Sequence, residues 1–109
     1  MQGKSLIPKA TKVASSALVL KAQGGVLRSL NVVAGASAGF AMLIDAAAEP
    51  ANGAVTPKRV WPIAANGSLD TKFQEVGLQC RDGVVIVFST TGPFTYTASA
   101  TAFIAGEAE

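Results

Sequence analysis

The titratable side chains of this chain are few, and they do not form a catalytic set. The sequence has no histidine, the side chain most often used for general acid–base catalysis. Its seven carboxylates are scattered, and no pair of them has a spacing that implies a shared proton. Cys80 is the single cysteine and, without a histidine, cannot belong to a Cys–His nucleophilic pair. We therefore expect that this protein is not an enzyme.

Sites for metals, phosphates and disulfides are equally unsupported by the residue types. One cysteine without histidine excludes the common zinc-ligand sets, and no segment has the dense Asp and Asn alternation of a calcium loop. Gly24-Gly25 lacks the Lys-Ser/Thr ending of a phosphate-binding loop. We expect no metal and no cofactor. Cys80 is interpreted as a buried small hydrophobic residue, and Asp45 as a cap on a loop backbone.

Composition indicates one domain that associates with other surfaces. The chain has 109 residues, of which 50% are hydrophobic and 15% charged, whereas about 25% charged is typical. Either the surface is weakly charged or neighbours cover much of it, and we favour the second because exposed apolar patches mark interaction sites. The net charge of +2 is too small to indicate a nucleic-acid partner. We expect no cleavable signal peptide and no membrane helix, since no apolar run reaches the ~20 residues that such a helix needs.

Short runs of β-type residues separated by turn residues predict an all-β fold. We expect a β-sandwich or jelly roll of about eight short antiparallel strands at 15–109, preceded by a flexible basic arm at 1–14. The expected strands are 15–20, 26–33, 39–45, 59–64, 68–73, 76–80, 84–89 and 97–104.

Turn and proline residues refine this expectation. Asn66-Gly67 and Asp82-Gly83 favour tight hairpin turns because these residues tolerate positive φ angles. The continuous apolar run at 84–88 (VVIVF) predicts a central strand that is covered on both faces. Pro62 lacks a backbone N–H, so its strand should lie at a sheet edge or carry a bulge.

The segment at 39–45 (GFAMLID) is apolar on both faces of a strand. Phe40, Met42 and Ile44 point one way, while Ala41 and Leu43 point the other way. A small domain has one core to fill, so the second row needs another cover. We assign Ala41 and Leu43 to the core, and the row of Phe40, Met42 and Ile44 to a subunit interface.

Several blocks of sequence follow one another over about residues 15–105. The blocks are SSALVLKA at 15–22, Leu27 with LNV at 30–32, GASAGF at 35–40 with ML at 42–43 and DAA at 45–47, the loop at 50–57, WPIAAN at 61–66 and GVVIVFSTTGPF at 83–94. In their order and spacing, these blocks resemble small structural proteins encoded among the virion genes of tailed bacteriophages.

The resemblance implies a capsid decoration (cement) protein, made in the host bacterial cytoplasm and located on the capsid surface of the virion. Such a subunit forms a homotrimer or a dimer and binds the major capsid protein lattice to stabilise the head. The resemblance implies no catalytic residues for this chain. It also implies no specific nucleic-acid partner and no membrane partner. Lys4, Lys9 and Lys12 precede any acidic residue, and we interpret them as a capsid-contacting arm. Solvated termini that keep an apolar body in solution are the other interpretation of these charges.

Two alternative functions remain open at this point. A receptor- or carbohydrate-binding module of a phage fibre or tail would need exposed aromatic rings, for which Trp61 and Tyr96 are the candidates. A minor head–tail component is the other alternative. Fold alone does not separate these functions.

Overall fold

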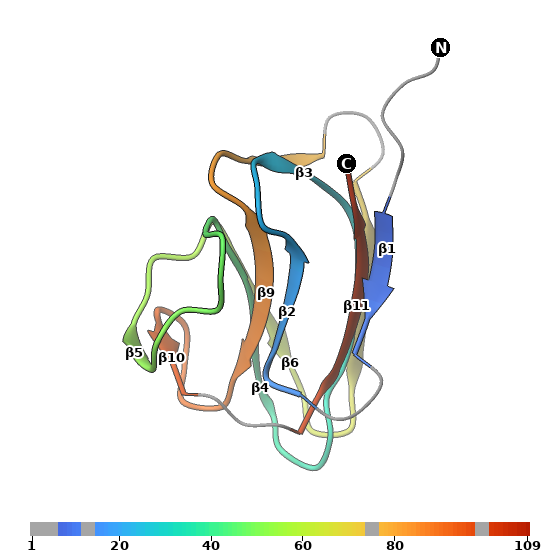
Figure 1. The fold of residues 1–109 in the computed structure, drawn as a ribbon. Helices are drawn as coiled ribbons and strands as arrows, with labels where there is room; N and C mark the ends of the chain where they lie inside the picture. Colours follow the sequence, from blue (N-terminus) through green and yellow to red (C-terminus); the bar gives the residue numbers. More distant parts are fainter. Residues whose placement is uncertain (1–6, 12–14, 74–76, 98–100) are drawn as a thin grey trace.

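Two antiparallel β-sheets packed face to face form the body of the molecule (Figure 1). The computed structural model describes residues 7–11, 15–73, 77–97 and 101–109. These ranges hold strands, bends and turns and no helix, which confirms the all-β class and is consistent with a β-sandwich. No helix able to cross a membrane therefore occurs in the described ranges.

Each sheet combines strands from distant parts of the chain. Sheet 1 has the order β1 (Ile7–Ala10), β11 (Phe103–Ala108), β3 (Gly25–Val33) and β7 (Ser68–Lys72), and β8 (Leu78–Cys80) pairs with β3 beyond the end of β7. Sheet 2 has the order β2 (Ala17–Lys21), β9 (Val84–Ser89), β4 (Gly39–Ile44) and β6 (Arg59–Ile63). A two-residue ribbon joins β5 (Gly53–Ala54) to β10 (Thr95–Tyr96).

The main core lies between the two sheets and follows from alternation along the strands. Leu30 and Val32 of β3 point inward, while Ser29, Asn31 and Val33 point outward. The apolar side chains of this core come from both sheets and pack together as one cluster. The fully or nearly fully buried members are Leu20, Leu27, Leu30, Val32, Ala34, Ala41, Leu43, Ile63, Cys80, Val84, Ile86, Phe88, Ala102, Ile104 and Ala108.

A second apolar cluster lies on the other face of sheet 2. The segment between β4 and β6 and the β5–β10 ribbon fold over this face, on the left of Figure 1. Every residue of β9 is buried as a result, since the strand has the main core on one face and this cover on the other. The prediction of a central strand covered on both sides is confirmed. The second cluster consists of Met42, Ile44, Val85, Val87 and Tyr96.

Several sequence expectations about strand pairing are borne out and others are wrong. Pro62 lies in β6 at an edge of sheet 2, as predicted. Asn66 does form a turn with φ of 59°. Its turn and the Asp82-Gly83 turn do not close hairpins, however. Each joins a strand of one sheet to a strand of the other, because β6 and β7, like β8 and β9, belong to different sheets.

The two ends of the described chain also differ from expectation. The predicted strand at 97–104 is displaced along the chain: β11 covers Phe103–Ala108, and residues 98–100 lie outside the described ranges. The arm expected at 1–14 is wrong for Ile7–Ala10, which pairs with β11 as an edge strand. An edge position tolerates Pro8, which has no N–H to donate. The jelly-roll topology stays a prediction.

Candidate interaction surface

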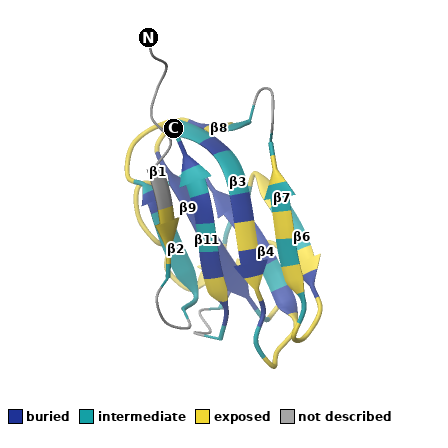
Figure 2. Ribbon diagram, turned by 90° about the vertical axis from the view of Figure 1, so that its right-hand side faces the viewer, coloured by how far each residue is buried: buried dark blue, intermediate teal, exposed yellow. Residues whose placement is uncertain are grey.

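The strands β1, β11, β3 and β7 of sheet 1 lie side by side in Figure 2. We call the outward residues of β11, β3 and β7, together with Ala10 of β1, the outer face of sheet 1. The strand register arranges the residues of β11, β3 and β7 in three rows that cross the sheet. The strand register places Glu107, Ser29 and Lys72 in the first row. The second row consists of Ala105, Asn31 and Asp70, and the third of Phe103, Val33 and Ser68.

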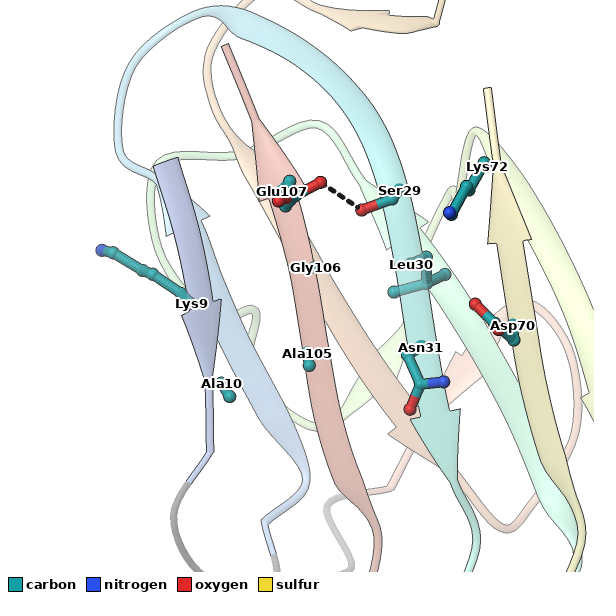
Figure 3. Close-up of a pocket in the computed structure, with 10 residues that line it drawn as sticks. All are labelled: Lys9, Ala10, Ser29, Leu30, Asn31, Asp70, Lys72, Ala105, Gly106 and Glu107. Carbon is teal, nitrogen blue, oxygen red and sulfur yellow. Dashed lines mark hydrogen bonds between the residues drawn. The ribbon is translucent and has the colours of Figure 1, made fainter. Parts of the chain in front are cut away.

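A shallow hollow of about 380 Å³ lies in this face (Figure 3). Its floor is low because Ala10 and Ala105 present only methyl groups beside the backbone of Gly106. Polar side chains stand around the floor, and Ser29 Oγ donates a 3.1 Å hydrogen bond to Glu107 Oε1. The hollow is open to solvent and has short walls, so it suits a protruding side chain of a protein partner better than an enclosed small molecule.

The third row of the outer face exposes apolar area. Phe103 is 48% exposed and Val33 is 40% exposed, and the two residues are direct cross-strand partners. The two side chains form one small continuous apolar area on this face. Phe94, 59% exposed, is the other large exposed apolar side chain of the described residues and lies in the turn before β10, away from this face.

The row of β4 that we assigned to a subunit interface has a different environment. Met42 is fully buried and Ile44 is 7% exposed, and both pack with Tyr96 in the second cluster. The expectation that these two side chains need a sister subunit to cover them is therefore wrong, because the chain supplies the cover. Phe40 is half-buried at the margin of this cluster. Ala41 and Leu43 lie in the main core, as predicted.

The basic residues proposed for capsid contact are only partly described. Lys9 is exposed on the edge strand β1, and its Nζ lies 3.4 Å from the carbonyl oxygen of Val19 in sheet 2. It thus spans the two sheets at this edge. Lys4 and Lys12 lie outside the described residues.

The aromatic residues considered for carbohydrate binding are not displayed as a platform. Tyr96 is fully buried, which corrects the expectation that its ring is exposed. Trp61 is half-buried and packs against the main core, with its ring centroid 6.2 Å from that of Phe73. Stacking of a sugar requires an exposed ring face, which the fully buried Tyr96 does not offer.

Cys80 has the structural role that the sequence predicted, whereas Asp45 caps the turn at 81–83 and not the loop that follows it in the chain. The carboxylate of Asp45 accepts hydrogen bonds from the backbone N–H groups of Arg81, Asp82 and Gly83, at 2.9, 2.7 and 3.3 Å. These hydrogen bonds hold the pKa of Asp45 below its usual value. Cys80 is a buried free cysteine, and burial raises the pKa of its thiol, so the unreactive thiol form is favoured.

Within the described ranges, no group of three or more acidic, cysteine or histidine side chains is placed to hold a metal ion. Comparison with known proteins adds no identification: no protein-family model, curated protein or solved structure matches the chain.

Sequence reasoning missed the outer face of sheet 1. Along β3, Leu30 and Val32 alternate with Asn31 and Val33, and such alternation predicts one exposed row on this strand. Nothing in the sequence shows that β11 and β7 flank this strand, so the three rows could not be assembled before the register was known.

Proposed function

We propose that this chain is a structural subunit of a phage particle, of the capsid decoration type, that acts by binding other protein surfaces. The observation that carries the proposal is the outer face of sheet 1, where exposed Phe103 and Val33 adjoin a shallow hollow. An ordered sheet face of this kind presents a fixed pattern of side chains at little entropic cost, because the strands behind it are already packed.

The construction of the molecule supports a mechanical role. The main core and the second cluster bury both faces of the central strand β9, so bending of sheet 2 would open packed apolar area on either side. Interiors packed in this way have low compressibility. A subunit that bridges neighbouring capsid proteins against outward pressure requires such stiffness. The resemblance of the sequence blocks supplies the assignment to a phage head.

Binding to phage heads tests the proposal. The full chain is incubated with purified heads that lack decoration protein, and the heads are sedimented and analysed by quantitative mass spectrometry against the major capsid protein. We expect hundreds of copies per head and an increase in the temperature at which the heads release DNA. A handful of copies on complete virions would indicate a fibre or tail role instead, and no bound copies would overturn the proposal.

A further inference from the structure

We propose that the outer face of sheet 1 binds the same face of a second copy of this chain, with a twofold axis parallel to β3. This inference rests on the proposed assembly function and names the partner of that surface. It follows from the way in which charges and apolar groups are distributed on the two sides of β3.

The first row of the face is complementary to itself. Glu107 on β11 and Lys72 on β7 lie on opposite sides of Ser29 (Figure 3). Rotation by half a turn about an axis along β3 places the β11 of one copy over the β7 of the other. Each Glu107 then faces the Lys72 of its partner, which gives two equivalent ion pairs. An isologous contact requires this reciprocity.

The other two rows fit the same rotation. In the third row, Val33 meets its own counterpart on the axis, with one Phe103 on each side, so four exposed apolar side chains form one strip. In the second row, the two Asn31 side chains meet on the axis, and each Asp70 lies over the hollow above Ala105 of the partner. The hollow thus provides room for a polar side chain where a flat face would clash.

A twofold axis perpendicular to β3 would not have this effect. It would superpose β11 on β11 and β7 on β7, which brings Glu107 and Phe103 of the two copies toward each other. The carboxylate would then be desolvated beside an aromatic ring without a cationic partner, which is unfavourable. Charge complementarity therefore selects the axis parallel to β3.

The size of the face sets the expected strength. Strands about 4.8 Å apart and residues about 3.4 Å apart give a face of roughly 19 Å by 17 Å. This area of about 320 Å² is smaller than the ~800 Å² per partner of a standard stable interface, so we expect a weak dimer. Many copies held on one lattice would raise the effective concentration of the chain and favour this weak contact.

Sedimentation of the isolated full chain tests the inference. We expect the wild-type chain to dimerise, and Lys72→Glu or Glu107→Lys to weaken dimerisation at least tenfold, because each creates two like-charged contacts. The double variant Lys72→Glu/Glu107→Lys should restore the dimer, since both pairs are then reversed. Phe103→Ser should also weaken dimerisation, whereas Phe94→Ser, which removes a more exposed ring elsewhere, should not.

Circular dichroism of each variant confirms that it is folded before association is measured. A wild-type chain that stays monomeric at high micromolar concentration would overturn the inference, and so would a double variant as weak as the single ones. Short bismaleimide cross-linking in a Cys80→Ala background checks the axis. Asn31→Cys and Val33→Cys should both cross-link to their own counterparts, while Ser68→Cys should not. Because dimerisation is measured without heads, its failure leaves the head-binding result intact, and the reverse also holds.

Discussion

The hydroxyl of Tyr96 connects three segments that are distant in the sequence. Its Oη lies 2.5 Å from Glu49 Oε2 and 3.0 Å from Ser16 Oγ. Glu49 belongs to the segment that covers sheet 2, and Ser16 immediately precedes β2. Burial, followed by the hydrogen bond to Glu49, raises the pKa of Tyr96 to about 12. The neutral phenol is therefore the form that stabilises the fold.

We predict that Tyr96→Phe lowers the free energy of unfolding by about 1–2 kcal/mol at pH 7, because it removes the hydroxyl and its buried hydrogen bonds. The pKa is raised on folding, so the contribution of the phenol is complete below pH 10 and is lost as the pH rises toward 12. Urea unfolding of the wild type and of Tyr96→Phe from pH 7 to pH 12 measures the free energy of unfolding of each. The stability difference between wild type and variant should shrink above pH 10.

Phe73→Leu is a suitable control for this pH series, because it changes an aromatic side chain without a titratable group. Its stability difference from the wild type should not depend on pH between 10 and 12. A Tyr96→Phe difference that stayed constant over the same range would contradict the assigned role of the hydroxyl.

At the scale of elements, β4 is a strand with a buried apolar row on each face. Leu43 belongs to the main core and Met42 to the second cluster, and both are fully buried. We predict that Met42→Ala and Leu43→Ala each lower the free energy of unfolding by about 2–5 kcal/mol, because each leaves a cavity. The loss should be independent of protein concentration, since the chain covers both rows by itself.

Denaturant unfolding at two protein concentrations, about twentyfold apart and both below the dimer dissociation constant, makes this measurement. Thr56→Ala, at an exposed position of the covering segment, is the control and should change stability little. If Met42→Ala were nearly neutral in the dilute protein, the second row would depend on a partner after all.

The sequence predicted individual strands better than their pairing. The run of β9 and the proline in β6 carry local signals for a central and an edge strand, and both positions are confirmed. The sequence FIAGEA of β11 contains weak strand formers, and its place between β1 and β3 depends on long-range register. The cover over Met42 was missed because a two-residue ribbon leaves no periodic pattern.

For the whole molecule, the observed position of β1 changes how an N-terminal truncation should be designed. Deletion of residues 1–6 leaves β1 in place, whereas deletion of residues 1–10 removes it and exposes the edge of β11. We predict that the longer deletion lowers the free energy of unfolding by about 2–4 kcal/mol through lost backbone hydrogen bonds. It should also promote aggregation through the open edge.

Thermal unfolding and light scattering of both truncated chains check this prediction. The shorter deletion is the control and should unfold as the full chain does. Comparing the two deletions also separates two possible causes of weaker head binding. The shorter deletion removes Lys4 but keeps β1, whereas the longer deletion removes both. A longer deletion as stable as the shorter one would show that β1 contributes little to the sheet.

The position of β11 also has a consequence for the order of events during folding. This strand lies inside sheet 1, between β1 and β3, and Ile7 is paired with Ala108. A ribosome makes both flanking strands long before it makes residues 103–108. Sheet 1 therefore cannot close until residues 103–108 have been made, and β1 and β3 must wait with an open gap between them. Pairing of strands so far apart in the chain is slow, on the order of milliseconds to seconds. During that interval, the β11 strand of another nascent chain can pair with β1 and β3 in its place.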